Sequence, residues 1–157
     1  MDPQTTIGHI HLKVSDLERS VKFYSEVLGF DVVTRLGDSA AFLSAGGYHH
    51  HIGLNTWESS GGQPPARGTT GLFHFAILVP TRKALAQAVQ RLADHGYAID
   101  GTADHGVSEA IYLHDPDYNG IEIYTDRPKE QWPHEENGAI EMVTKPLDMD
   151  SLMKELL

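Results

Sequence analysis

Residues 7–29 read IGHIHLKVSDLERSVKFYSEVLG, and two kinds of apolar periodicity follow one another in this stretch. Apolar and polar side chains alternate through its first part, which predicts a strand over 7–14. Ser15 to Glu18 then form a capping box, and apolar side chains at helical spacing continue to Gly29, a residue type that commonly ends helices. The stretch therefore predicts a strand that leads directly into a helix.

The rest of the chain repeats this order. Three strand-like runs follow the helix, and a second copy of the whole pattern begins at Gly71. Equivalent residues keep a nearly constant spacing, since His9 and His74 are 65 residues apart and Gly53 and Gly120 are 67 apart. The predicted fold class is therefore α+β, with two βαβββ units. The other predicted elements are strands at 30–36, 40–44 and 48–56 in the first copy, and strand 72–79, helix 81–95 and strands 97–101, 108–114 and 119–125 in the second.

We expect the two copies to form a single domain over residues 1–157. The first repeat spans about 5–57 and the second about 71–127, and the Ser-, Gly- and Pro-rich residues 58–70 form the linker between them. An acidic, proline-containing tail, 128–157, is expected to end in a short helix.

Composition restricts the classes of protein to which this chain can belong. The net charge of −10, from 12 basic and 22 acidic residues, argues against nucleic acids and anionic membranes as partners. Cysteine is absent, which is typical of a reducing compartment and excludes thiolate metal sites. The first residues lack the pattern of a signal peptide, so a cytoplasmic location is expected. Ten histidines raise the expectation of a metal or acid–base site.

Two histidines and one glutamate are the candidate metal ligands. His9 and His74 occupy equivalent places in the opening strands of the two repeats. Glu122 stands between Ile121 and Ile123, so its carboxylate points away from the apolar face of the last strand. Each of the three alone is more simply explained as a surface side chain. Brought together by pairing of the repeats, they match the set of two His and one carboxylate that leaves open positions on Fe(II).

Several segments carry a resemblance to a known superfamily, and they are residues 8–20, 23–24, 27–30 and 115–117 together with Glu122. They resemble the vicinal oxygen chelate superfamily, which includes glyoxalase I, fosfomycin-resistance transferases, bleomycin-binding proteins and extradiol ring-cleaving dioxygenases. The resemblance extends over about residues 5–127. It implies an eight-stranded, bowl-shaped mixed sheet around a metal with helices outside, formed within one chain or across a dimer, and a homodimer is the expected assembly.

Residues 105–122 resemble the signature of one branch of that superfamily, the extradiol dioxygenases. The shared features are a His, a spacer, an aliphatic residue followed by Tyr, an Asp-Pro turn and a Glu. The sequence departs from the pattern at Tyr118, where Gly is expected, and at Ala103, just ahead of the stretch. Residues 47–57 look like the corresponding part of the small relatives of bacterial catechol 2,3-dioxygenase.

This resemblance implies a small catechol and O2 as substrates, with Fe(II) as the metal and Mn(II) or another divalent ion as the alternative. His105 and Tyr112 would donate hydrogen bonds beside the substrate or oxygen. A histidine of the first repeat would exchange protons with the substrate, a role that suits histidine near neutral pH. Local alignment favours His50 for this role, whereas strand parity with Gly53 favours His51, so both are candidates.

Two other functions are compatible with the same fold. One is a glyoxalase-like isomerase, epimerase or thiol transferase that uses Mn, Ni, Zn or Mg, and the other is a metal-free protein that binds a small molecule such as a drug. The resemblance to glyoxalase I implies a fourth ligand, a second glutamate in the last strand of the first repeat. The 67-residue spacing places Asn55 there, and an amide is a weak ligand beside a carboxylate. A three-ligand site is therefore favoured, and the presence of all three ligands argues against a metal-free binder.

Overall fold

The computed structural model describes residues 1–157, which form two compact units. The first unit consists of residues 1–70 and the short turn 115–118, and the second consists of 71–114 and 119–157. Each unit contains a strand, a helix and three further strands in that order, so the prediction of two βαβββ units is confirmed. No helix is long and apolar enough to cross a membrane.

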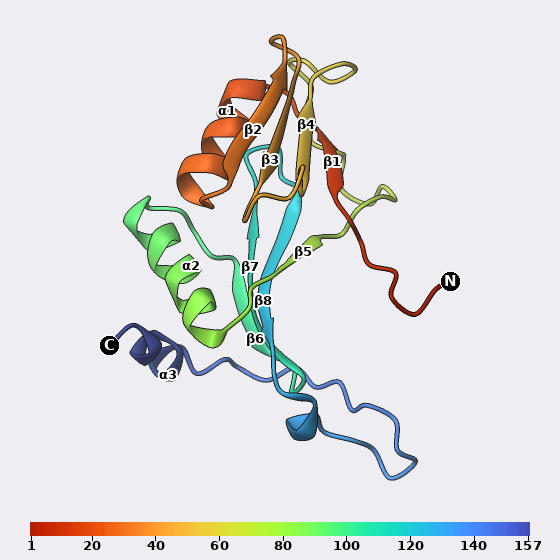
Figure 1. Cartoon of the computed structure of the whole chain (residues 1–157), viewed down its shortest axis with the longest axis vertical. Helices are drawn as coiled ribbons and strands as arrows, with labels where there is room; N and C mark the ends of the chain where they lie inside the picture. The colour runs from red at the N-terminus through yellow and green to blue at the C-terminus, as the bar shows by residue number, and fades with distance from the viewer. The chain divides into compact units, whose positions relative to one another are not determined.

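The first unit is built from four strands and a helix that continues into a π turn. These elements are β1 (Ile10–Lys13), α1 (Leu17–Lys22), η1 (Phe23–Val27), β2 (Asp31–Leu36), β3 (Ala40–Ser44) and β4 (Ile52–Asn55). The strands form a mixed sheet in the order β1-β4-β3-β2, in which only β1 and β4 are parallel (Figure 1). α1 packs on β3 and β4 and buries Leu17 and Val21.

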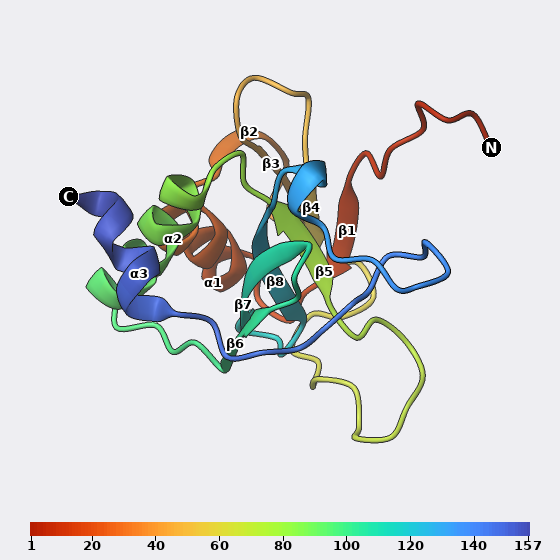
Figure 2. The same ribbon diagram turned by 90° about the horizontal axis from the view of Figure 1, so that it is seen from below.

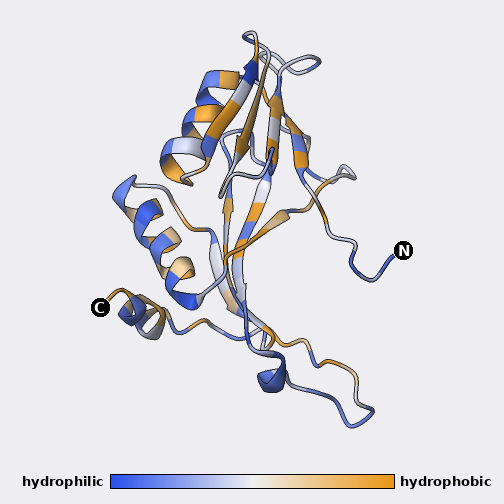
Figure 3. Ribbon diagram, in the orientation of Figure 1, coloured by the Kyte–Doolittle hydropathy of each residue, from blue (hydrophilic) through white to orange (hydrophobic).

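The second unit repeats this arrangement and adds a C-terminal segment. Its elements are β5 (Phe75–Leu78), α2 (Arg82–Asp94), β6 (Gly101–Asp104), β7 (Ser108–His114), β8 (Gly120–Asp126), η2 (Lys129–Gln131), α3 (Met149–Met153) and η3 (Lys154–Leu156). The sheet order is β5-β8-β7-β6, with β5 and β8 parallel. The eight strands therefore belong to two four-stranded sheets rather than one. Apolar residues lie along the strands, whereas the solvent-facing side of α2 is polar (Figure 3).

Both helices begin with a side-chain cap. The Asp16 carboxylate accepts a hydrogen bond from the Arg19 backbone N–H at 2.9 Å, and Thr81 caps α2 in the same way. The first helix differs from the expected regular helix because it widens into a π turn at Phe23. This turn lets two consecutive aromatic residues, Phe23 and Tyr24, both lie in the core, where they are 3% and 0% exposed.

The strand bounds were predicted well for β3 and β7 and less well for β1, β4, β5 and β6. The sequence predicts a strand over 97–101, but β6 begins only at Gly101. The physical reason is that the Tyr97 backbone N–H still bonds to the Leu92 carbonyl, which closes the end of α2 before the chain can join the sheet. Three other predicted strands are also shorter than expected, because their first residues do not pair. The strand predicted over 7–14 begins at Ile10, that over 48–56 at Ile52 and that over 72–79 at Phe75.

The turn 115–118 belongs to the first unit, and buried aspartates hold it there. Asp117 is 8% exposed and accepts hydrogen bonds from the Ser15 hydroxyl at 2.6 Å and from the Arg19 guanidinium at 2.7 Å. Asp115, which is 3% exposed, accepts one from the Tyr24 hydroxyl at 2.8 Å. The next residue of the turn, Tyr118, has a φ of 67°, a left-handed conformation that glycine adopts more easily. The resemblance to the extradiol signature implies glycine at this position, and glycine would adopt this conformation without strain.

The C-terminal segment returns to the second unit after leaving β8. Its last helix, α3, contacts α2 and buries Leu152 completely, and the two helices lie side by side in both views (Figures 1 and 2). Between Trp132 and α3 the chain runs past the end of β6, where Lys145 forms an isolated antiparallel bridge with Asp104. The tail is therefore part of the folded second unit.

Candidate metal centre

A histidine and a glutamate form the centre of the site in the second unit. His74 directly precedes β5, and Glu122 lies on the neighbouring strand β8, opposite Ala76. The Nε2 atom of His74 is 3.0 Å from the Oε2 atom of Glu122. The two side chains are 32% and 14% exposed, so both are partly accessible to solvent. The structure therefore brings these two predicted ligands together.

The donor set of this pair fits a divalent metal ion. Imidazole nitrogen and carboxylate oxygen bind such ions at about 2.0–2.2 Å, so two donors at right angles lie about 3 Å apart. The Nε2–Oε2 separation of 3.0 Å agrees with that spacing. Within neither unit do three or more His, Asp or Glu side chains come together as possible ligands. The third predicted ligand, His9, belongs to the first unit, and the complete triad stays a prediction.

The close approach of His74 to β8 depends on Gly120. A methyl group added at Gly120 would lie 2.3 Å from the Phe73 carbonyl oxygen and 3.1 Å from the His74 Cβ atom. Backbone cannot move away as a flexible side chain can, so only glycine lets the two strands approach this closely. Sequence reasoning missed this role, although a glycine at the start of a buried strand is a recognised signal of close approach.

We expect Gly120→Ala to displace His74 and to lower the affinity for Fe(II) by about 10- to 100-fold, the effect typical of disturbing the support of a ligand. The control is Gly101→Ala, also at a strand glycine, where an added methyl group has no neighbour within 4 Å. Anaerobic equilibrium dialysis with Fe(II) measures both affinities. Equal affinities in the two variants would show that Gly120 does not position the ligand.

A tyrosine and a histidine continue the hydrogen-bonded chain from Glu122. Tyr112 lies opposite Glu122 on β7, and its hydroxyl donates to Glu122 Oε1 at 3.1 Å. Its oxygen is also 2.7 Å from Nε2 of His105. Burial, followed by the negative charge of Glu122, raises the pKa of Tyr112 to about 12. The hydroxyl therefore keeps its proton near neutral pH and acts as a hydrogen-bond donor to Glu122, and its expected role beside a substrate or oxygen stays a prediction.

In the first unit the histidines divide into two groups. The ring of His50 lies against that of His9, with 4.3 Å between the centroids and 47° between the ring planes. Its Nδ1 lies 2.7 Å from Nδ1 of His49. His51 instead turns toward Ser44, since its Nδ1 is 3.2 Å from the Ser44 hydroxyl. Burial and, secondarily, the charge of His9 lower the pKa of His50. The geometry of this unit therefore places His50, rather than His51, beside the predicted ligand His9.

The pairing of β1 with β4 tests the position assigned to a fourth ligand. His11 pairs with Gly53 in the first unit, and the residue 65 positions later, Ala76, pairs with Glu122 in the second. By pairing, Gly53 rather than Asn55 is the equivalent of Glu122. The spacing between equivalent residues of β4 and β8 is therefore 69 residues (122 − 53), two more than the spacing of 67 used to assign Asn55. Neither residue carries a carboxylate, so the expectation of three ligands is unchanged.

Comparisons with known proteins agree with this architecture. Residues 6–123 match the model of the Glyoxalase/Bleomycin resistance protein/Dioxygenase superfamily. The chain is 46% identical over 151 residues to a catechol-2,3-dioxygenase of Bacillus subtilis (strain 168). This match covers 96% of the present chain and 52% of the relative. It is also 32% identical over 122 residues to biphenyl-2,3-diol 1,2-dioxygenase 3 of Rhodococcus globerulus. This second match covers 76% of the present chain and 63% of that relative.

A solved structure shows the same fold. The glyoxylase/bleomycin resistance protein/dioxygenase domain from Frankia sp. EAN1pec superposes with a TM-score of 0.64 at 26% identity, and the match covers 78% of this chain and 98% of that domain. The chain spans about half the length of the Bacillus subtilis relative and less than two thirds of the Rhodococcus globerulus one.

Proposed function

The chain belongs to the Glyoxalase/Bleomycin resistance protein/Dioxygenase superfamily, and from this membership we propose that it is a metal-dependent extradiol-type dioxygenase. Its substrates would be O2 and a small catechol. The observation that carries the proposal is the Glu122 carboxylate, which faces His74 through one oxygen and Tyr112 through the other. The similarity to two dioxygenases whose names specify catechol and biphenyl-2,3-diol supports it.

The proposed metal ligands are His9, His74 and Glu122, with Fe(II) as the metal and Mn(II) as the alternative. Such an ion, when bound, would supply a Lewis acid and a route for electrons between the catechol and O2. In the overall reaction one ring carbon–carbon bond beside the diol breaks, and both atoms of O2 enter the product. The catechol is thereby oxidised and O2 is reduced, and no further reductant is required.

The side chains of the chain itself would handle the protons. We assign proton exchange with a catechol hydroxyl to Nε2 of His50, because Nδ1 of the same ring faces His49 at 2.7 Å. His50 would take a proton from the hydroxyl as the diol binds and return it when the ring opens. The Tyr112 hydroxyl, which keeps its proton near neutral pH, would donate a hydrogen bond toward oxygen atoms at the site.

Oxygen consumption tests the proposal directly. The full chain is reconstituted anaerobically with Fe(II), its iron content is measured, and it is then mixed with simple and substituted catechols in an oxygen electrode. We expect one O2 consumed for each catechol and a yellow ring-opened product. Absence of uptake by protein that holds iron would contradict the proposal and favour a non-oxidative enzyme acting on thiol or oxoacid substrates.

The two histidine candidates can be distinguished by matched substitutions. We expect His50→Gln to lower kcat for ring cleavage by about 10²-fold, the low end of the range for loss of a general acid–base group. His51→Gln should change kcat far less, because its ring is engaged with Ser44 and Tyr48. Steady-state kinetics of both variants at equal iron content measure this difference. Equal losses, or a larger loss in the His51 variant, would refute the assignment.

A further inference from the structure

The C-terminal strap, residues 132–147, reaches the site in the second unit through backbone atoms. The Asp104 backbone N–H donates to the Lys145 carbonyl at 2.8 Å, and the Lys145 N–H donates back to the Asp104 carbonyl at 2.9 Å. Two residues earlier, the Val143 N–H donates to the carbonyl of His105 at 3.3 Å. The strap thus pairs with the chain just where β6 ends and His105 begins the turn to β7.

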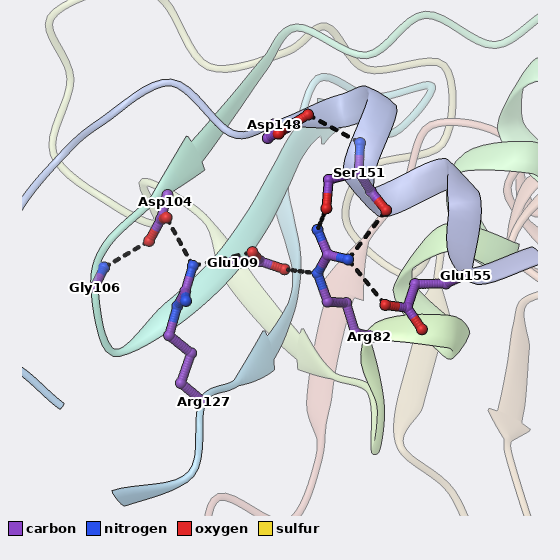
Figure 4. Close-up of polar contacts among 8 residues, drawn as sticks. All are labelled: Arg82, Asp104, Gly106, Glu109, Arg127, Asp148, Ser151 and Glu155. Carbon is purple, nitrogen blue, oxygen red and sulfur yellow. Dashed lines mark hydrogen bonds and ion pairs between the residues drawn. The ribbon is translucent and has the colours of Figure 1, made fainter. Parts of the chain in front are cut away.

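The chain on either side of the strap is linked to one buried carboxylate, Glu109, directly through Arg127 before it and through Arg82 to Ser151 after it (Figure 4). The Glu109 side chain is 9% exposed and accepts hydrogen bonds from Arg127 at 3.0 Å and from Arg82 at 2.7 Å. Arg127 directly follows β8, where the C-terminal segment begins. Arg82 in turn donates to the hydroxyl and the carbonyl of Ser151 on α3, both at 3.1 Å. The length of chain between these anchors is therefore held against the sheet at its two ends.

Within the strap, one carbonyl group contacts the ring of His105. The Val143 carbonyl oxygen lies 2.8 Å from Nδ1 of His105. A carbonyl can only accept a hydrogen bond, so Nδ1 must carry the proton. In a neutral ring Nε2 then has no hydrogen and is an acceptor, and this atom is 2.7 Å from the Tyr112 hydroxyl oxygen. Tyr112 can therefore share its single proton between His105 and Glu122 Oε1.

We propose that the C-terminal strap positions His105 for the reaction, with the Val143 carbonyl holding the ring in the Nδ1-protonated form so that Nε2 accepts from Tyr112. Val143 is then a positioning residue, which acts through His105 and not on the substrate. Without the strap the ring could reverse its tautomer or rotate. A protonated Nε2 would then donate to the Tyr112 oxygen instead of accepting from it, and the Tyr112 proton would go to Glu122 alone. The effect on ring cleavage rests on the proposed function, whereas the tautomer of His105 is a property of the metal-free chain.

Nitrogen NMR of the metal-free, histidine-labelled full chain tests this proposal. At about pH 8.5, two units above the ordinary histidine pKa of about 6.5, a neutral ring shows which nitrogen is protonated, because the two states differ widely in 15N chemical shift. A His105→Gln spectrum assigns the signals. Lys145→Pro removes the N–H that bonds to Asp104, and Lys145→Ala is the matched control that keeps it.

The expected result is an Nδ1-protonated His105 in the native chain and in Lys145→Ala, and loss of that signal in favour of the Nε2-protonated form in Lys145→Pro. In iron-loaded protein we expect kcat of the proline variant to fall about tenfold with KM unchanged, at the low end for outer partners of a metal site. An Nε2-protonated His105 in the native chain would overturn the proposal, and this outcome can be read even if the proline variant fails to fold. In a folded Lys145→Pro variant, an unchanged tautomer of His105 would overturn it as well. Because the spectra need neither metal nor substrate, failure of the dioxygenase proposal would leave this result standing.

Discussion

Replacement of Glu122 by glutamine is expected to lower kcat/KM for catechol cleavage by about 10³-fold. A bound metal contributes several kcal/mol to catalysis, and each 1.4 kcal/mol corresponds to about a factor of ten in rate. Glutamine keeps an oxygen that can accept from the Tyr112 hydroxyl, so the side-chain packing should survive. The negative charge that faces His74 at 3.0 Å is lost, and with it the anionic ligand of the proposed metal.

Two measurements separate this effect from a general loss of structure. Iron content after desalting should fall together with oxygen uptake in Glu122→Gln. Tyr112→Phe is the control, since it removes the 3.1 Å hydrogen bond to the same carboxylate but leaves the charge in place. We expect it to retain iron and to lose about 10- to 100-fold in activity. Full activity in Glu122→Gln would show that the metal is held elsewhere in the protein.

Removal of the buried Glu109 carboxylate is expected to have the largest effect on stability. Glu109→Ala removes the anion that Arg82 and Arg127 share. Each arginine then keeps one other carboxylate partner, Glu155 at 2.9 Å for Arg82 and Asp104 at 2.7 Å for Arg127. Breaking a buried ion pair by removing one partner costs about 3–5 kcal/mol. We expect a loss near 3 kcal/mol in the free energy of unfolding, because the two arginine side chains are 28% and 32% exposed and keep part of their hydration.

The neighbouring Glu155 offers a matched control for this prediction. It also binds Arg82, at 2.9 Å, but its side chain is 39% exposed. Exposed ion pairs contribute at most about 1 kcal/mol, so Glu155→Ala should change stability little. Urea denaturation followed by circular dichroism measures both variants at the same pH and salt concentration. A loss below 1 kcal/mol in Glu109→Ala would mean that the two guanidinium groups are solvated once the carboxylate is gone.

Much of the fold could be predicted because its signals are local. Capping residues and apolar spacing predicted α2 to within one residue at each end, and alternation predicted β7 over its observed length. The π turn at Phe23 was not predicted, because it satisfies the packing of two adjacent aromatic residues and leaves the helical pattern intact. The division of the strands into two sheets of four depends on which edges pair, which periodicity does not encode.

The candidate site was predictable where side chains carry the chemistry. The repeat identified His74 and Glu122, and the resemblance to extradiol dioxygenases identified His105 and Tyr112, all of which the second unit brings into one hydrogen-bonded chain. The choice between His50 and His51 needed the direction of each ring. The Val143 carbonyl had no signal at all, because every residue has the same backbone acceptor and only the folded path of the tail places this one beside His105.

The turn 115–118 has a consequence for how this chain can be divided. The linker 58–70 separates the two repeats in sequence, but the chain re-enters the first unit between β7 and β8. A cut in the linker would therefore give two fragments that are not the two units. The shorter fragment would lack the partners of Tyr24 and Arg19, and the longer would expose Asp115 and Asp117, which are buried in the intact protein. The two repeats of this sequence are therefore not interchangeable structural modules.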